Sequence, residues 1–594
     1  MSTLLITPPL TGLNTTYPAT TVLQGYLRSM GHSNCNQWDM SIALVERIFS
    51  SSFLSKLFDS IELNDNFSSN CINLYVARKQ YIATVDCVWK FLRNTDPTLA
   101  QRIVTGNFLP QGARFGVYDD EELTWAFGSS GTVEQAKHFA TLYIQDLTDF
   151  IREVVDPYFD LIRYGEQIAM SLPNFQIILD RIENKTIISS LIIELLEEKI
   201  TLLSPSVIGF TIPFPGCLIS AIRCGQYIKQ KYPNIKVVFG GGYINTELRS
   251  ITDSRIFNFV DYIVYDDGEL PLKQIIEGGP LVRTAYRNNL GEIVFENMEA
   301  REPFVSISDF TGINSSSYIS LLELANPMHR LWSDGFWNKI TAAHGCYWAK
   351  CTFCDTSLDY IGRYDPLPAK TIVDTMERVM KQTGSSGFHF TDEALPPKLL
   401  KEIAEEILSR KIIVSYWGNI RFEKAYTAEL CKLLAQSGCI AVSGGLEVAS
   451  PDILLKINKG VTIEQARKAM GNFTLNNIMV HAYLMYGFPT QTLAQTIESL
   501  NVVRNMFADN LIQSAFWHCF TMTIHSPIGK CPQNYNAKIT GCQNNSFANN
   551  GISFKEINGK HDYDIVAVGE ALRRATYNYM HGVGMELPVR KWFR

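Results

Sequence analysis

Residues 341–355 read TAAHGCYWAKCTFCD and hold three closely spaced cysteines, Cys346, Cys351 and Cys354. Thiolates are soft ligands that suit zinc or an iron–sulfur cluster. A structural zinc ion takes four ligands, but only three cysteines lie close together here. Three thiolates leave one iron of a four-iron cluster open to bind a substrate. The segment therefore predicts an iron–sulfur cluster. A zinc site with His344 as the fourth ligand and three unrelated core cysteines are the alternatives.

The cysteines follow the first of six candidate strands in the second half of the chain. These strands are expected at 339–343, 387–391, 412–417, 439–444, 480–486 and 515–522. Helical patterns of apolar residues lie between them, for example at 399–409 and 463–474. The alternation predicts a partial (β/α)6 barrel of the TIM type over residues 296–530, with its chemistry at the carboxyl ends of the strands.

Strand–helix alternation also marks the first part of the chain. Short apolar strands are expected at 4–7, 35–42, 207–211, 237–239 and 262–264. Such strands, joined by helices, predict an α/β domain over residues 1–295, with a Rossmann-like, doubly wound parallel sheet covered on both faces. Residues 45–200 are amphipathic and predict a helical insertion into this domain. Residues 531–594 are expected to form a small C-terminal domain or cap, with a helix near 565–580.

Composition limits the class of protein. The length of 594 residues predicts several domains, because single cores rarely grow beyond about 250–300 residues. The net charge of -6 gives no basic surface of the kind that nucleic acids bind. No apolar run reaches the roughly 20 residues of a membrane span, no basic leader opens the sequence, and the scattered cysteines do not form a disulfide scaffold. We therefore expect a cytoplasmic protein without a membrane span or a nucleic-acid partner.

Four further polar segments each follow a candidate strand. They are GFHFTDE at 387–393, WGNIR at 417–421, SGGLE at 443–447 and MYGFPT at 485–490. Together with the cysteines, they resemble segments of cobalamin-dependent radical S-adenosylmethionine (SAM) enzymes, and the resemblance covers nearly all of residues 1–530. The family's commonest cysteine spacing is C-x3-C-x2-C, whereas this sequence has one additional residue in the first gap.

The resemblance implies a 4Fe–4S cluster on the three cysteines, with SAM bound at its open iron. Reductive cleavage of SAM would then give a 5′-deoxyadenosyl radical that abstracts a hydrogen atom from the substrate. By resemblance, the residues that contact SAM are Phe353, Asp392, Glu393, Arg421, Ser443, Glu447, Gly487 and Pro489. Possible acid–base or substrate groups are Tyr486, His389, His481 and His518. For each position taken singly, an ordinary strand-end or core residue is the plainer alternative.

The first domain resembles the cobalamin-binding module of the same family. By resemblance, the contacts to cobalamin are Pro8, Pro9, Tyr17, Thr211, Pro213, Phe214, Gly240, Gly241, Gly242, Tyr243, Gly268 and Glu269. Glycines at such positions let the backbone approach a bulky ring closely. The Asp-x-His-x-x-Gly motif of other corrinoid proteins is absent, since Asp39 is followed by Met40 and Ser41. Cobalamin is therefore expected to bind without a histidine lower ligand. A doubly wound domain without a cofactor is the alternative.

The function implied by the resemblance is that of a radical SAM enzyme. The first hypothesis is a methyltransferase that moves a methyl group to an unactivated carbon of a peptide or small molecule through methylcobalamin. The second is a non-methylating radical SAM enzyme that forms rings, rearranges rings or oxidises its substrate. The third is a non-catalytic corrinoid- or metal-binding protein. An electron donor such as flavodoxin or ferredoxin is the expected partner, and the sequence leaves the substrate open.

Overall fold

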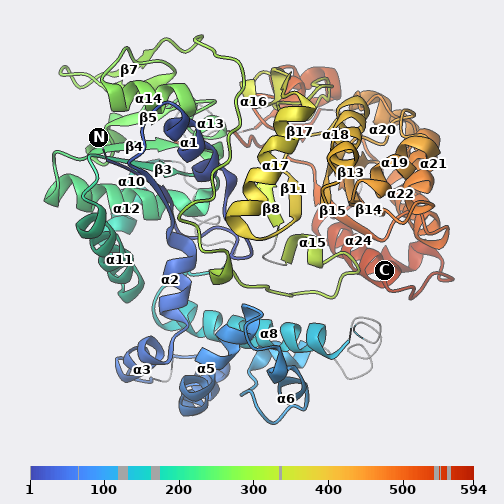
Figure 1. Ribbon diagram of the computed structural model, residues 1–594. Helices are drawn as coiled ribbons and strands as arrows, with labels where there is room; N and C mark the ends of the chain where they lie inside the picture. Colours follow the sequence, from blue (N-terminus) through green and yellow to red (C-terminus); the bar gives the residue numbers. More distant parts are fainter. Residues whose placement is uncertain are drawn as a thin grey trace.

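The fold is built on two sheets that lie side by side (Figure 1). The computed structural model describes residues 2–593 except 65, 118–126, 128–130, 162–173, 334–336, 541–546, 549 and 558–562. A seven-stranded sheet belongs to the first half of the chain, and a six-stranded sheet belongs to the second half. Four helices lie below both sheets in Figure 1: α3 (Ser51–Asp59), α5 (Arg78–Leu92), α6 (Ala100–Val104) and α8 (Thr132–Val154).

The first sheet has the strand order β2-β1-β3-β4-β5-β6-β7. Its strands are β1 (Thr3–Thr7), β2 (Cys35–Asp39), β3 (Val207–Thr211), β4 (Lys236–Gly240), β5 (Tyr262–Val264), β6 (Thr284–Arg287) and β7 (Ile293–Glu296). The first five strands run parallel, and β6 and β7 add an antiparallel hairpin at one edge. The five parallel strands confirm those predicted from the sequence, whereas the hairpin was not predicted.

Both faces of this sheet are covered by helices. Alternate side chains such as Leu5 and Val238 pack against α1 (Pro18–Ser29) and α14 (Glu269–Glu277). The other face, with Leu4 and Ile208 among its residues, belongs to the core that includes the remaining helices of this half. They include α2 (Met40–Ile48), α4 (Ser69–Val76), α10 (Gln176–Glu183), α11 (Ile187–Leu203), α12 (Pro215–Lys231) and α13 (Gly242–Thr246). Because strand side chains alternate between faces, short apolar strands give this doubly wound α/β arrangement, as expected.

The second sheet is entirely parallel, with the order β15-β14-β13-β12-β11-β8. Its strands are β8 (Trp337–Ile340), β11 (Gly387–Phe390), β12 (Ser415–Ile420), β13 (Cys439–Glu447), β14 (Met479–Tyr486) and β15 (Ser514–Cys519). Each strand neighbours the next one in the chain, which is the order of a partial barrel. The six strands confirm the strand–helix alternation predicted from the sequence.

Helices form the outer layer of the barrel (Figure 1). They are α17 (Ala369–Thr383), α18 (Pro397–Arg410), α19 (Ala428–Gln436), α20 (Pro451–Lys456), α21 (Ile463–Thr474), α22 (Leu493–Ala508) and α24 (Ile565–Met580). Helix α24 comes from the C-terminal tail, and its Leu572 and Ala575 join the barrel core. An apolar floor closes the barrel at the end opposite to the carboxyl ends of its strands. It is formed by Met328 and Leu331, from the segment around α15 (Arg330–Ser333), which pack under Trp417.

The barrel strands differ from the sequence prediction in their ends by up to three residues, and β8 and β12 show why. Strand β8 ends at Ile340, because the amides of Ala342 and Ala343 donate to the carboxylate of Asp392 (2.7–3.1 Å) instead of continuing the ladder. Strand β12 runs three residues later than predicted, because Tyr416 and the residues after it pair with β13. Both ends are decided by partners that are distant in sequence.

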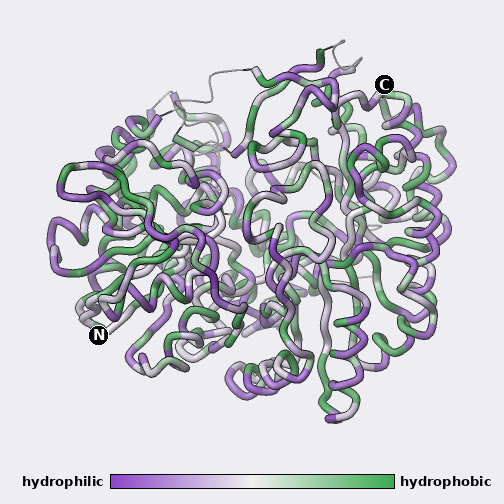
Figure 2. The backbone as a smooth tube through the Cα atoms, turned by 90° about the horizontal axis from the view of Figure 1, so that it is seen from above, coloured by the Kyte–Doolittle hydropathy of each residue, from purple (hydrophilic) through white to green (hydrophobic). Residues whose placement is uncertain are grey.

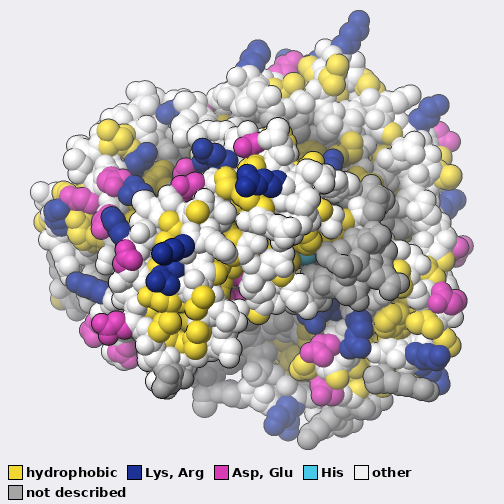
Figure 3. Space-filling model, turned by 90° about the horizontal axis from the view of Figure 1, so that it is seen from below, with side chains coloured by type: hydrophobic (Ala, Val, Ile, Leu, Met, Phe, Trp, Pro, Cys, Tyr) yellow, Lys and Arg dark blue, Asp and Glu magenta, His cyan; other side chains and the backbone are white. Residues whose placement is uncertain are grey.

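Hydropathy follows this layered plan. Figure 2 shows apolar segments running through the interior of both halves, with hydrophilic segments around them. On the face seen in Figure 3, basic and acidic side chains are interspersed. None of the described helices combines the length and the apolarity that crossing a bilayer requires.

Candidate active site

The three cysteines lie on a loop, residues 345–358, which we call the cysteine loop. Its base is a short antiparallel pairing of β9 (Ala343–His344) with β10 (Asp365–Pro366). Gly345 has a φ of +72°, and a Cβ atom there would lie 1.7 Å from the carbonyl oxygen of Arg363. A left-handed backbone and so close an approach both require glycine. The residue before the first cysteine is therefore fixed by the backbone path.

The first gap between cysteines accommodates four residues by a left-handed turn. Ala349, inside the gap, has a φ of 46°. The indole N–H of Trp348 donates to the carbonyl of Asn458 (2.9 Å), and the amide of Thr352 donates to the carbonyl of Ile457 (3.0 Å). These bonds tie the loop to the segment that follows α20. The additional residue is thus absorbed in a loop that stays anchored at two points.

The thiols lie in a partly dry, positively charged environment. Cys351 is 6% exposed, and Cys346 and Cys354 are partly buried. A hydrogen bond from Cys354 lowers the pKa of Cys351 to about 7; burial opposes this shift, and the positive charges of Lys459 and Arg421 support it. Metal ligands must be thiolates, so the loop presents one thiol that ionises readily beside two others.

A cavity of about 340 Å³, the cysteine cavity, opens beside this loop at the carboxyl ends of the barrel strands. The structure brings eight predicted residues together in its wall: Cys346, Cys351, Phe353, Cys354, Glu393, Arg421, Ser443 and Glu447. His518, a possible substrate group in the sequence, lines it as well. Asn419, Lys459 and Tyr483 also line it and were not predicted.

A strand irregularity aims Glu447 at the cavity. Strand β13 shifts register against β14 between Gly445 and Glu447, and Glu447 has a φ of 60°. Such bulges re-aim side chains next to active sites. The Glu447 carboxylate pairs with Nζ of Lys459 at 2.7 Å, and the Arg421 guanidinium donates to the carbonyl of Lys459 at 2.6 Å. This part of the cavity wall therefore holds two cations and the Glu447 carboxylate in fixed positions.

A second cavity, of about 240 Å³, lies at the carboxyl ends of β1, β3, β4 and β5 and reaches the barrel at Thr341. We call it the interdomain cavity. Six predicted residues line it: Tyr17, Thr211, Gly240, Gly241, Gly268 and Glu269. The hydroxyls of Thr20 and Thr211 are buried there without a hydrogen-bond partner among the described residues. Apolar side chains such as Leu23 and Phe304 form much of the remaining wall, and no histidine is among the described residues that line it.

One part of the barrel sequence matches a known family. Residues 340–503 match the radical SAM superfamily. The matched segment, which we call the radical SAM domain, contains the cysteine loop and β11–β14.

Relatives with curated names match about half of the chain. An uncharacterized methyltransferase of Pyrococcus horikoshii is 25% identical over 312 residues, which are 51% of this chain and 65% of the relative. The anaerobic magnesium-protoporphyrin IX monomethyl ester cyclase of Rubrivivax gelatinosus is 27% identical over 342 residues, 54% of this chain and 58% of the relative. A solved structure of the cobalamin-dependent SAM radical enzyme OxsB has a TM-score of 0.49 at 13% identity, covering 64% of this chain and 59% of that one. The chain thus spans less than two thirds of each of these proteins.

Four predicted residues of the radical SAM domain lie away from the cysteine cavity. Asp392 is 2% exposed and turns toward the end of β8, and burial raises its pKa to about 7. Tyr486 lies on the outer side of β14, where a Cβ on Gly569 of α24 would be 2.1 Å from its hydroxyl. The structure therefore does not support a catalytic role for Tyr486. Gly487 and Pro489, at the turn after β14, are also absent from the cavity wall.

Half of the predicted cobalamin contacts lie outside the interdomain cavity. They are Pro8, Pro9, Pro213, Phe214, Gly242 and Tyr243. Phe214 remains close, because its ring meets that of Tyr17 edge-on at 6.0 Å. Tyr243 is 3% exposed and packs in the core under the sheet instead. The wall contains other residues that were not among the predicted contacts, for example Asp266, Asp267, Ser306 and Thr341.

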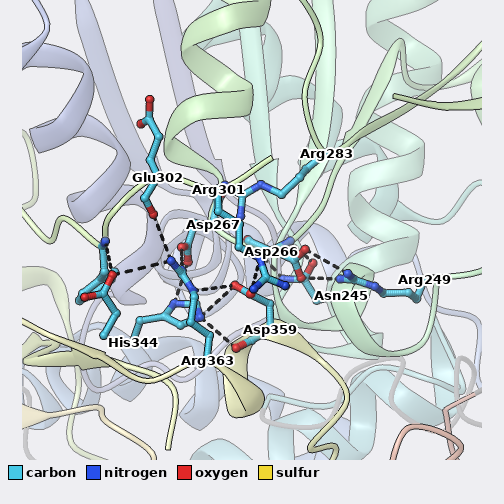
Figure 4. Close-up of polar contacts among 12 residues, drawn as sticks. Asn245, Arg249, Asp266, Asp267, Arg283, Arg301, Glu302, His344, Asp359 and Arg363 are labelled. Carbon is cyan, nitrogen blue, oxygen red and sulfur yellow. Dashed lines mark hydrogen bonds and ion pairs between the residues drawn. The ribbon is translucent and has the colours of Figure 1, made fainter. Parts of the chain in front are cut away.

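A polar cluster joins the radical SAM domain to the first sheet (Figure 4). His344 lies between two carboxylates, with Nδ1 2.9 Å from Asp267 and Nε2 3.1 Å from Asp359. Arg363 pairs with the same two carboxylates. Burial lowers the pKa of His344, but the two acids outweigh it and raise the pKa to about 9. We call these four residues the ion-pair cluster. Since both ring nitrogens of His344 face carboxylates, its ring does not face the cysteines as a fourth zinc ligand would.

Proposed function

We propose that this radical SAM enzyme is a cobalamin-dependent methyltransferase acting on an unactivated carbon of a peptide or small molecule. The observation that carries the proposal is the pair of cavities: one is walled by three thiols, and the other lies at the strand ends of a doubly wound sheet and touches the same barrel. Ligands of such sheets bind beyond the carboxyl ends of the strands. The two cavities suit two cofactors that work on one substrate.

The cysteine cavity fits a 4Fe–4S cluster with SAM. Three thiols suit three irons, and a fourth iron would face the cavity, where Glu393, Arg421 and Glu447 offer charges to an amino acid. Ser443 and Asn419 add polar oxygens that are buried without a hydrogen-bond partner among the described residues. When bound, the reduced cluster supplies the electron that cleaves SAM. The chain's own part is to orient SAM and to exclude water.

The interdomain cavity fits a corrinoid. Gly209, Gly240 and Gly241 line the cavity without side chains. At Gly241 the backbone packing requires this, because a Cβ there would lie 2.7 Å from the backbone of Ile212. The unpartnered hydroxyls of Thr20 and Thr211 suit the polar groups of a ligand. When bound, cobalamin supplies a methyl group for transfer.

The relatives support methyl transfer and leave one second candidate. One relative is named a methyltransferase, and its match covers 51% of this chain. The second candidate is ring formation without methylation, because the other relative is named a cyclase. In both cases we propose that a small redox protein such as flavodoxin or ferredoxin supplies electrons. We also propose domains at 1–295, 296–530 and 531–594, with the tail helix α24 built into the barrel wall.

Cys351→Ala tests the proposed chemistry. The variant is compared with Cys531→Ala, which removes an exposed cysteine far along the chain. Both are purified anaerobically, supplied with iron, sulfide, cobalamin and SAM carrying a labelled methyl group, and reduced with dithionite. The wild type and Cys531→Ala are expected to retain iron and to release 5′-deoxyadenosine, and Cys351→Ala is expected to do neither.

The fate of the label separates the hypotheses. Labelled methyl in the corrinoid fraction, and then in a product, supports methyl transfer. Release of 5′-deoxyadenosine with no label in either fraction favours the second candidate. A wild type that binds no iron and releases no 5′-deoxyadenosine, with a Cys351→Ala variant that behaves in the same way, leaves only a non-catalytic binding protein and overturns the proposal.

A further inference from the structure

One wall of the barrel interior carries a lysine. Lys339 on β8 pairs in register with His389 on β11, and His389 pairs in register with Trp417 on β12. Side chains of residues in register point to the same face of a sheet. The rings of His389 and Trp417 stack at 3.6 Å, and Trp417 packs on the apolar floor with Met328. Lys339 therefore faces the inside of the barrel, just above its floor.

Lys339 has no direct partner for its charge. Among the described residues, none makes a hydrogen bond or an ion pair with its Nζ, and the carboxylate that acts on it through space is that of Asp39. That carboxylate already accepts hydrogen bonds from the Tyr318 hydroxyl (2.9 Å) and the Ser41 amide (3.0 Å). Burial lowers the pKa of Lys339 to about 8. A largely desolvated cation without a direct partner is costly, so a ligand that brings a negative charge to the partly buried Lys339 would lower this penalty.

The position of Lys339 on its strand is central to the proposed chemistry. Two residues earlier, on the same face of β8, Trp337 packs against the floor. Two residues later, Thr341 lines the interdomain cavity. Lys339 thus stands between the floor of the barrel and the proposed corrinoid site. A molecule held by this ammonium group would lie inside the barrel and below that site.

The far wall of the interior is aromatic and open. Tyr483 on β14 and Phe516 on β15 pair in register, and they are 39% and 56% exposed. Their strand neighbours Leu484 and Trp517 point the other way and are buried in the core. Large rings exposed on the inner face indicate space that an apolar ligand can fill. Tyr483 also lines the cysteine cavity, so this space continues to the proposed SAM site.

We propose that Lys339 binds a carboxylate of the substrate, while an apolar aromatic part of the same molecule lies against Tyr483 and Phe516. The inference rests on the proposed function, because it uses the two cofactor sites to locate the substrate. His389 beside Lys339 adds no competing charge, since burial and the charge of Lys339 lower its pKa to about 3. The substrate class is thus an apolar carboxylic acid.

The test compares an aromatic acid with its ester. Naphthoate and methyl naphthoate share one ring system and differ in charge. Their dissociation constants are measured by equilibrium dialysis on the full chain, reconstituted anaerobically with cluster, cobalamin and SAM. We expect the acid to bind about tenfold more tightly than the ester, as a charged hydrogen bond in a dry site allows. Lys339→Met should abolish this preference, and Lys398→Met, at a side chain that is 89% exposed, should keep it.

Two further measurements separate other causes. Lys339→Met should bind cobalamin and SAM as the wild type does; a variant that loses either cofactor would show that Lys339 serves the phosphate of the corrinoid or the carboxylate of SAM. Equal binding of acid and ester by the wild type, or a preference that survives in Lys339→Met, would also overturn the inference. Release of 5′-deoxyadenosine, measured on the same samples, reports on the proposed function separately.

Discussion

Gly345 is the residue whose backbone most directly shapes the cysteine loop. It shares a φ of +72° with Gly384 at the end of α17, but the two glycines differ in their surroundings. A Cβ at 345 would lie 1.7 Å from the carbonyl oxygen of Arg363, whereas a Cβ at 384 would have nothing within 4 Å. The pair therefore separates the cost of a left-handed backbone from the cost of a collision.

We predict that Gly345→Ala loses the cluster while the fold persists. The methyl group must push the segment around Arg363 away from the cysteine loop, so that the three thiols no longer converge. Gly384→Ala carries only the strain of a left-handed residue, about 1–2 kcal/mol, and should bind iron normally. Iron and sulfide content after anaerobic reconstitution, with circular dichroism for the fold, decides the matter. Equal iron content in the two variants would contradict the role given to Gly345.

At the scale of elements, a buried glutamate fastens the helical insertion to the barrel. Glu134 on α8 is 2% exposed. Its carboxylate lies 2.8 Å from Nε2 of His329, just before α15, and 2.7 Å from the guanidinium of Arg330, the first residue of α15. Burial would raise the pKa of Glu134, but the hydrogen bond from His329 and the charge of Lys137 outweigh it and lower the pKa from 4.5 to about 2. The contact thus favours an ionised carboxylate inside the protein.

We predict that Glu134→Gln weakens this contact by about 2 kcal/mol at neutral pH, because a buried charge loses its partner. A lowered pKa gives stability that is present above the ordinary value of 4.5 and is lost as the pH falls toward 2. The difference between wild type and variant in the free energy of urea unfolding should therefore stay constant down to about pH 4.5 and shrink as the pH falls from there toward 2. Arg330→Gln, at a side chain that is 64% exposed, should cost less than about 1 kcal/mol. A difference that does not change with pH would refute the ionic origin.

The same scale shows what the sequence could predict. Periodicity located α21 and α24 within their observed bounds, since both carry clear apolar faces. It could not assign Tyr486, because a shift of one residue along a strand reverses the side: Tyr483 faces the cavity and Tyr486 faces α24. Lys459 escaped prediction because it follows α20 in a loop and reaches Glu447 only through the tertiary fold. The cysteine loop and the motifs at strand ends thus identified eight residues of the cavity wall, whereas Lys459 in a loop and Asn419 and Tyr483 on strands were missed.

For the whole molecule, the interface between the two halves links the interdomain cavity to the base of the cysteine loop. The turn at 266–269 lines the interdomain cavity, and its Asp267 is also a member of the ion-pair cluster at the base of the cysteine loop. The segment between β7 and β8 adds to this contact. The amide of Phe304 donates to the Asp365 carboxylate (2.7 Å), and the ring of Phe304 lies 5.7 Å from the ring of His344. One turn therefore touches the proposed corrinoid site on one side and the cysteine loop on the other.

We predict that Asp267→Asn uncouples these two sites. The amide removes a charge that pairs with His344 and Arg363, so the turn loses its hold on the cysteine loop. In the wild type, bound cobalamin should slow hydrogen exchange at residues 359–365. In Asp267→Asn, cobalamin affinity should fall about tenfold and this slowing of exchange should be lost. Asp253→Asn is the control, because Asp253 pairs with Arg255 in the same half of the chain, away from the interface. Exchange measured with and without cobalamin on all three proteins gives the answer. Protection that persists in Asp267→Asn would show that the ion-pair cluster only stabilises the fold.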